Sequence, residues 1–239
     1  MITAGWPQPV VIGAVLTGQV RPFGPKGLPS GIDKLPVAGP VRVTTLGIAG
    51  DGQGDPKHHG GPEKALHHYA YDHYAAWRDE LSGESGEAAK VLARPGAFGE
   101  NLSTTGLTEA DICIGDRFRL GTALVEVSQA RQPCWKLNHR FGHGGMSRAE
   151  QHGLRTGWYY RVVEEAVVSA GDTLHLVERE CPDWTLQRLL HVLYVDRLDY
   201  AALAGMAKLT PLAESWRKLA RQRVAKREVE DMERRLAGA

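Results

Sequence analysis

Turn-forming and apolar residues are distributed so unevenly that the chain divides into two parts. The residues before Thr185 contain 26 of the 28 glycines and 12 of the 13 prolines. Both residue types punctuate turns and are poor in the interiors of helices and strands. We therefore expect short strands joined by many turns before Thr185, and helices after it.

Runs of alternating or β-branched residues supply the predicted strands. The segments with this pattern are 10–16, 41–46, 116–120, 124–128 and 173–178. The third and fourth of them read as a hairpin around Gly121 and Thr122. Several short strands at this spacing predict a barrel or a sandwich, so the fold class is mainly β.

Apolar residues at helical intervals predict four helices. One lies among the strands, over 63–81, where Leu66, Tyr69, Tyr74 and Trp77 recur at roughly that spacing. The other three follow Thr185, which is a plausible N-cap, and a Thr210–Pro211 step begins the last. These three helices cover 186–194, 198–207 and 212 toward 236. The prediction is a β domain over 1–184, with its core at about 10–180, and a three-helix segment over 185–239.

Composition excludes several classes of protein. Of 239 residues, 42% are apolar and 24% charged, which is close to the globular average. No apolar run of about 18 residues and no signal-peptide pattern is visible, so we expect a cytoplasmic protein without a membrane span. Three cysteines, an odd number and widely spaced, predict reduced thiols.

The charge balance argues against nucleic acid as a partner, because the net charge is only +1. The segment 217–235 nevertheless holds eight basic and four acidic residues. We interpret it as a solvated helix face. The alternative is a non-enzymatic binding module whose basic helices dock to RNA or to a protein partner. A helical segment outside a barrel is also a plausible surface for a homodimer.

The densest concentration of reactive side chains surrounds Cys134. The segment 128–142 follows a predicted strand, and Pro133 fixes the backbone just before the thiol. Four basic or titratable side chains surround the Cys134 thiol within nine residues, namely Arg131, Lys136, His139 and Arg140. Cationic neighbours favour the thiolate, which is the form that attacks and that binds soft metals. Cys113 and Cys181 lack such neighbours, and we interpret them as packing residues.

A glycine-rich segment, 47–64, is the second candidate. Gly60 and Gly61 precede the predicted helix and could expose amides to an anion at its N-terminus. Five histidines follow or overlap this segment, namely His58, His59, His67, His68 and His73. Their spacing does not match a zinc motif, so we interpret them as hydrogen-bonding or exposed residues, with His59 as the exception because it adjoins the glycine pair.

Two shorter segments complete the candidates. In 95–102, two glycines flank Phe98 and present Asn101 at the start of a strand, where its amide can hold an amide-like or pterin-like edge. A plain turn explains that segment equally well. In 30–34, Lys34 could bind phosphate or simply be solvated.

Taken together, these segments resemble the MOSC domain, the C-terminal fold of molybdenum cofactor sulfurases, in its YiiM-like bacterial branch. The resemblance spans most of residues 10–180, and the helical remainder is similar to the three-helix segment of that branch. The motifs that carry it are SGIDKLPVAGPVRV at 30–43, GIAGDGQGDPKHHGGPEKALHHY at 47–69, PGAFGENLSTTGLTEADICIGDRFRLG at 95–121, VSQARQPCWKLNHRFG at 127–142 and RTGWYYRV at 155–162.

The resemblance implies a β-barrel that binds the molybdenum cofactor, molybdopterin. It makes Cys134 the catalytic protein ligand to molybdenum. Arg131 and Lys136 would then neutralise phosphate or oxo charge, and Lys34 matches a family lysine. By the same resemblance, His59, Gly60, Gly61 and Asn101 line the cofactor pocket.

The implied activity is reduction of small N-hydroxylated substrates, such as hydroxylaminopurine-type bases, to amines by oxygen removal at molybdenum. Two electrons and two protons are consumed and water is released. The chain shows no flavin, nicotinamide or cluster motif, so we expect an external electron-donor reductase. The alternative is a persulfide carrier, in which Cys134 accepts sulfur for the maturation of a metal–sulfur cofactor.

Overall fold

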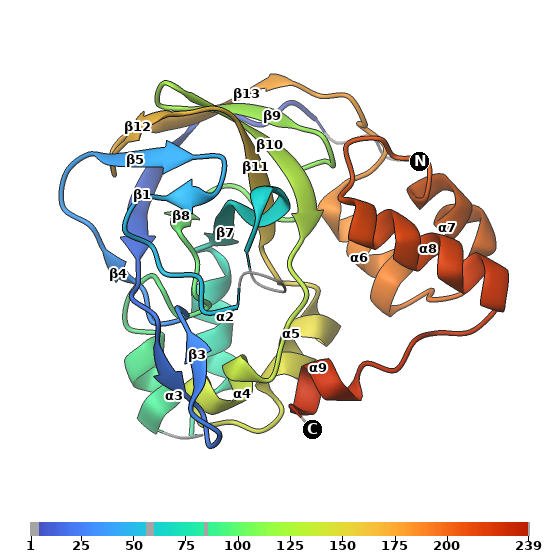
Figure 1. Ribbon diagram of the computed structural model, residues 1–239, viewed down its shortest axis with the longest axis horizontal. Helices are drawn as coiled ribbons and strands as arrows, with labels where there is room; N and C mark the ends of the chain where they lie inside the picture. Colours follow the sequence, from blue (N-terminus) through green and yellow to red (C-terminus); the bar gives the residue numbers. More distant parts are fainter. Residues whose placement is uncertain (1–4, 56–59, 84–85, 239) are drawn as a thin grey trace.

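The alternation of buried and half-exposed residues in the strands builds a β-barrel, which dominates the computed structural model (Figure 1). In β9, for example, Phe118 and Leu120 are buried whereas Arg117 and Arg119 face outward. The structure describes residues 5–55, 60–83 and 86–238. The barrel strands are β1 (Val10–Thr17), β7 (Leu66–Ala70), β8 (Leu102–Thr104), β9 (Arg117–Leu120), β10 (Ala123–Ala130), β11 (Trp158–Glu164) and β13 (Thr173–Glu178).

The barrel is mixed and closed. Its strand order is β1-β8-β7-β11-β10-β9-β13, and Val10 of β1 pairs with Leu174 of β13 to close it. Neighbouring strands are antiparallel except β7 and β8, which are parallel. Closure satisfies the strand edges that an open sheet would expose. The predicted mainly β barrel is confirmed.

Shorter strands surround the barrel. Beside β1 lies β4 (Leu35–Pro36). The remaining strands form one three-stranded sheet and one hairpin: β12 (Ala166–Val168), β5 (Val41–Thr44) and β6 (Gly47–Ile48), then β2 (Arg21–Phe23) and β3 (Leu28–Ser30). The predicted hairpin around Gly121 and Thr122 is confirmed, because Leu120 pairs with Ala123 across that turn and Gly121 has a φ of 55°.

The helix predicted over 63–81 is wrong. The structure has a 3₁₀ turn, η1 (Pro62–Lys64), then strand β7, and then α2 (His73–Glu80). All five residues of β7 are buried, because Leu66 packs into the apolar cluster of the barrel and Tyr69, on the opposite face of the strand, packs into a second apolar cluster. A strand that is covered on both faces loses the alternation that would identify it. Its apolar residues then fit a helical spacing by coincidence.

Four helices pack at one end of the barrel and form a second apolar cluster (Figure 1). They are α2, α3 (Gly86–Val91), α4 (Lys136–Phe141) and α5 (Met146–Gly153). At the centre of the cluster, the rings of Tyr69 and Phe98 stack with their centroids 3.9 Å apart. Phe98 belongs to the loop that precedes β8, so this packing fixes that loop against the barrel.

The helices after Thr185 lie beside the barrel (Figure 1). They are α6 (Leu186–Tyr194), α7 (Tyr200–Met206) and α8 (Glu214–Lys226). Thr185 caps α6 as predicted, because its hydroxyl accepts the Arg188 amide at 3.1 Å. Buried leucines of α6 belong to the same apolar cluster as the barrel strands.

The last predicted helix, 212–236, is in fact two. The N-cap of α8 is Ala213 rather than Thr210, and α8 ends at Lys226, where the C-cap residue Arg227 adopts a left-handed conformation with a φ of 58°. The chain then turns back, and α9 (Glu233–Ala237) lies beside α4 and α5 at the far end of the barrel (Figure 1). Across 5–55, 60–83 and 86–238, no helix has both the length and the apolar character needed to cross a membrane.

Candidate active site

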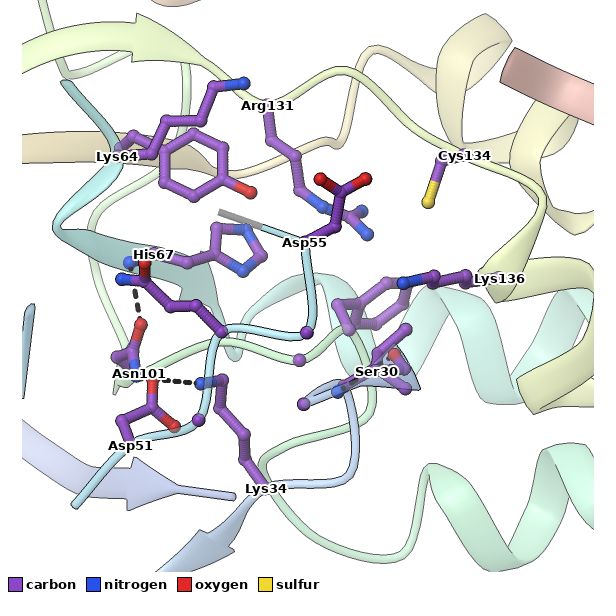
Figure 2. Close-up of a pocket in the computed structure, with 18 of the residues that line it drawn as sticks. Ser30, Lys34, Asp51, Asp55, Lys64, His67, Asn101, Arg131, Cys134 and Lys136 are labelled. Atoms are coloured by element: carbon purple, nitrogen blue, oxygen red, sulfur yellow. Dashed lines mark hydrogen bonds and ion pairs between the residues drawn. The ribbon is translucent and has the colours of Figure 1, made fainter. Parts of the chain in front are cut away.

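A pocket of about 80 Å³ lies where five segments of the chain meet: 30–34, 51–55, 64–67, 98–101 and 131–136. Figure 2 shows the side chains that line it. The polar ones are Ser30, Lys34, Asp51, Gln53, Asp55, Lys64, His67, Asn101, Arg131, Cys134, Lys136 and Tyr159.

Cys134 reaches the pocket from the loop that joins β10 to α4. The loop begins where the Arg131 amide donates to the Gly157 carbonyl at 3.0 Å, and it ends where the Leu137 amide donates to the Cys134 carbonyl at 3.0 Å. Cys134 is only 6% exposed, and its sulfur faces the pocket (Figure 2). The thiol is therefore available to a ligand in the pocket but shielded from bulk solvent.

Arg131 is held by a buried ion pair. Its Nη1 donates to both carboxylate oxygens of Glu150, at 2.8 and 2.9 Å, and neither side chain is more than 7% exposed. Burial disfavours the charge of Arg131, but the Glu150 carboxylate outweighs this effect and raises the pKa of the guanidinium. Arg131 thus brings a permanent positive charge to the wall of the pocket.

Three lysines add to this charge. Burial lowers the pKa values of Lys34, Lys64 and Lys136 below the ordinary 10.5. Lys136 Nζ donates to the neutral Pro29 carbonyl at 3.0 Å, whereas Lys34 pairs with Asp51. An anion that entered the pocket would offset the cost of burying these ammonium groups.

Asp51 organises one side of the pocket. Its carboxylate accepts the Gly18 amide at 2.8 Å and the Asn101 side-chain amide at 2.8 Å, in addition to Lys34. Asn101 Oδ1 in turn accepts the His67 amide at 3.0 Å (Figure 2). The donor and acceptor of the Asn101 amide therefore already bind protein groups.

His67 presents a neutral ring. Burial first, and then the charge of Arg131, hold its pKa well below the usual range. Among the described residues, no group forms a hydrogen bond with its Nε2. The next histidine is satisfied instead, since His68 contacts the Tyr160 hydroxyl at 3.1 Å and Thr104 Oγ1 at 2.8 Å. A buried ring nitrogen without a partner is a group that a ligand can satisfy.

Glycines let two loops approach closely beneath the pocket. A Cβ atom on Gly31 would lie 1.9 Å from the Gly52 carbonyl oxygen, and one on Gly54 would lie 2.5 Å from the Ser30 Cα. The predicted importance of the segment 47–64 thus has a steric basis. Its predicted helix N-terminus is wrong, however, because Gly61 is followed by a three-residue 3₁₀ turn rather than an α-helix.

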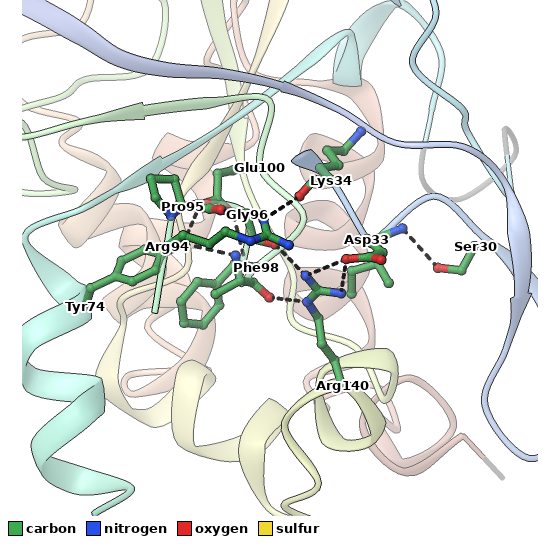
Figure 3. A network of polar contacts seen from close by, with 12 residues as sticks. Ser30, Asp33, Lys34, Tyr74, Arg94, Pro95, Gly96, Phe98, Glu100 and Arg140 are labelled. Atoms are coloured by element: carbon green, nitrogen blue, oxygen red, sulfur yellow. Dashed lines mark hydrogen bonds and ion pairs between the residues drawn. The ribbon is translucent and has the colours of Figure 1, made fainter. Parts of the chain in front are cut away.

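The loop 95–101 is held by a network of hydrogen bonds, which Figure 3 shows. Glu100 accepts the Gly96 amide at 2.7 Å and the Phe98 amide at 3.0 Å. From the other side, Arg140 donates to the Ala97 carbonyl at 2.7 Å and to Asp33 at 3.2 Å. This network ties together the two loops that carry Asn101 and Lys34.

The structure brings most of the residues predicted from sequence around this one pocket. Those that line it are Lys34, Asn101, Arg131, Cys134 and Lys136. Gly60 and Gly61 are described but are not among its lining residues. His59 lies outside the described residues. The roles assigned to all of these residues stay predictions.

Sequence reasoning missed several lining residues. Asp51, Asp55 and Lys64 lie inside the glycine-rich segment that was singled out, but no role was assigned to them. The spacing of the histidines predicts an ordinary hydrogen-bonding or exposed residue at His67, and nothing in the sequence indicates that a strand buries it beside the pocket. Tyr159, from β11, lies in the motif at 155–162, but the sequence predicts no role for it.

Metal binding from protein side chains alone is not supported. Among the residues of 5–55, 60–83 and 86–238, no group of three His, Cys, Asp or Glu could hold a metal ion. Cys113 and Cys181 lie away from the pocket, and burial raises their pKa values to about 12 and about 11. Cys134 is thus the one soft ligand among the described lining residues, and it suits a metal that brings other ligands with it.

Known proteins are similar to this chain in sequence and in fold. The MOSC domain family matches residues 55–175, and the YiiM-like 3-alpha helix domain matches residues 184–227. Protein YiiM of Escherichia coli (strain K12) is 39% identical over 224 residues, which are 94% of this chain and 97% of that protein. A Gibberella moniliformis protein named "Reductase" is 36% identical over 93% of this chain and 39% of its own length.

A solved structure agrees with this relationship. The crystal structure of YiiM from Escherichia coli superposes with a TM-score of 0.76 at 34% identity, covering 91% of this chain and 98% of that one. The family match and the fold agree in both parts of the chain. The chain therefore belongs to the MOSC domain family, in the branch whose MOSC domain is followed by the YiiM-like three-helix domain.

Proposed function

We propose that this protein is a molybdenum-cofactor-dependent reductase that converts N-hydroxylated compounds, hydroxylaminopurine-type bases among them, to amines. The observation that carries the proposal is the pocket, in which one thiol, Cys134, shares a small volume with Lys34, Lys64, Arg131 and Lys136. The relative named "Reductase" supports the reaction class.

The donor set of the pocket fits the molybdenum cofactor. A pocket of about 80 Å³ holds only the end of such a large group, and its one thiol suits a metal that already has organic ligands. Cys134 would ligate the metal, and Lys136 and Arg131 would offset negative charge. When bound, the cofactor supplies two-electron redox chemistry at the N–O bond.

The surrounding residues prepare the site in distinct ways. Arg131 keeps its charge at every working pH because Glu150 is paired with it inside the protein. The ring of His67 stays neutral near pH 7, because its pKa is held well below the usual range. Its Nε2, which has no partner among the described residues, can form a hydrogen bond with a ligand. Phe98 and Tyr159 add ring surface to the lining and limit the space for water. The chain thus supplies charge, orientation and partial dehydration.

Electrons come from a partner under this proposal, because the sequence carries no flavin, nicotinamide or cluster motif. The fungal relative carries most of its length outside the matched region, where a donor module has room. Unpaired Cys113, Cys134 and Cys181 agree with a reducing, cytoplasmic setting.

The proposal is tested by an activity assay. Protein from a host that makes the cofactor is mixed with hydroxylaminopurine and a reduced viologen, and amine formation is followed. The wild type should release one amine and one water for every two electrons and two protons consumed. Cys134→Ser should lose this activity. Cys181→Ser is the matched control, because Cys181 is half-buried outside the pocket, and it should retain activity.

Two results would contradict the proposal. One is equal activity in wild type and Cys134→Ser, which would place the chemistry elsewhere. The other is an inactive, metal-free wild type that carries an extra sulfur on Cys134 by mass spectrometry. That result would favour the persulfide carrier instead.

A further inference from the structure

Both peptide groups that flank Cys134 form hydrogen bonds with one residue, Arg235. The Pro133 carbonyl belongs to the peptide bond before the cysteine, and it accepts from Arg235 Nη1. The Trp135 amide belongs to the peptide bond after it, and it donates to the Arg235 carbonyl at 2.8 Å. Arg235 lies about 100 residues further along the chain, in α9.

Further contacts hold α9 against the segment that follows Cys134. The Leu236 carbonyl accepts from Asn138 Nδ2 at 2.9 Å and from the Ser147 hydroxyl at 2.9 Å. Arg235 Nη2 also donates to Gln151 Oε1 at 2.9 Å, and Leu236 is buried. Helix α9 is therefore held by α4 and α5 as well as by the cysteine loop.

The connection between α8 and α9 is itself fixed. Arg223 of α8 is 1% exposed and donates to both carboxylate oxygens of Glu230, at 2.8 and 2.7 Å. It also donates to the Leu193 carbonyl at 2.9 Å, in α6. This pair holds the connecting segment on the three-helix domain and limits where α9 can lie.

We infer that Arg235 is a positioning residue for Cys134, and that α9 of the C-terminal helical part completes the active site. By holding the carbonyl before the cysteine and the amide after it, Arg235 restricts the backbone that aims the sulfur into the pocket. The functional part of this inference rests on the proposed function. The backbone restraint does not, because it concerns the protein without any ligand.

Hydrogen exchange tests the restraint directly. The exchange rate of the Trp135 amide is measured in full-length, metal-free wild type, Arg235→Ala and the control Arg234→Ala, which removes an equal charge from an exposed neighbour on the same helix. Removing the Arg235 guanidinium frees α9 from Pro133 and Gln151, so the Trp135 amide should exchange about tenfold faster. The Val127 amide, bonded to Asp116 within the barrel, reports on global stability and should not change.

Arg235→Lys covers the case in which the alanine variant does not fold. A lysine ammonium lacks the planar guanidinium that reaches two acceptors. The Trp135 amide of Arg235→Lys should therefore exchange faster than in wild type, but less than tenfold faster. Equal Trp135 rates in wild type and both Arg235 variants would overturn the inference, as would equal acceleration at Trp135 and Val127.

A second readout separates this inference from the proposed function. If the wild type is an active reductase, Arg235→Ala should lower kcat with little change in KM, because it moves the cysteine rather than the substrate contacts. If the wild type is inactive, the proposed function fails and the exchange data still decide the restraint. An unchanged kcat in an active enzyme would contradict the positioning role.

Discussion

The buried pair of Arg131 and Glu150 offers the sharpest test of how the pocket keeps its charge. Glu150→Gln preserves shape but removes the carboxylate, so a guanidinium that cannot lose its proton is left without a countercharge in the interior. The side chains are 7% and 0% exposed and make two hydrogen bonds. Breaking a buried pair from one side typically costs about 3–5 kcal/mol. For a chain of this length, that is a fall in Tm of roughly 6–20 °C.

The assay is urea unfolding of metal-free protein at neutral pH, so that ligand binding does not contribute to stability. Glu87→Gln is the matched control. It removes the same charge from the exposed pair with Lys90, where both side chains are more than half exposed, and it should change the free energy of unfolding by less than about 1 kcal/mol.

The double variant Arg131→Met, Glu150→Leu completes the test. Apolar replacement of both partners leaves no buried charge, so it should be more stable than Glu150→Gln alone. The reasoning is refuted if Glu150→Gln costs no more than Glu87→Gln, or if the costs of the single variants Arg131→Met and Glu150→Leu simply add in the double variant.

Two further predictions concern pH. Burial lowers the pKa of His68 from the ordinary 6.5 to about 3. Between these two pH values, the unfolded chain binds a proton that the folded chain does not. The free energy of unfolding should therefore fall by about 1.4 kcal/mol per pH unit as the pH drops from about 6 to 4. Urea unfolding should show that His68→Gln lacks this part of the slope, and an unchanged slope would contradict it. Because burial lowers the pKa of Lys136, calorimetry should show pyrophosphate binding weakening between neutral pH and about pH 10, before exposed lysines titrate. Lys136→Met should reduce the neutral-pH affinity by about tenfold and the exposed-site control Lys90→Met should not, while equal affinities in both variants would argue against an anion site.

The sequence predicted those parts of the fold that leave a local pattern. Alternation over 124–128 in β10 and the turn at Gly121 predict a hairpin, and the Thr185 cap predicts the start of α6. Strand β7 has no such pattern, because it is central in the barrel and all of its residues are buried. Its leucine and tyrosine fit a helical spacing equally well, so the sequence alone does not distinguish strand from helix there.

The candidate site was predictable to the extent that its residues cluster in sequence. Arg131, Cys134 and Lys136 lie within six positions, and the structure places all three on the pocket. His67 was missed along with the strand that carries it. The contact of Arg235 with the cysteine loop was not predictable, since no local pattern encodes a hydrogen bond between residues about 100 positions apart.

The central claim, that Cys134 holds the molybdenum of a bound cofactor, is tested most directly by metal analysis. Wild type, Cys134→Ser and Cys181→Ser are purified from a molybdate-fed host that makes the cofactor, and molybdenum per chain is measured. We expect about one molybdenum per chain in wild type and in Cys181→Ser, and little in Cys134→Ser. Equal molybdenum in wild type and Cys134→Ser, or none in any of the three, would contradict the account.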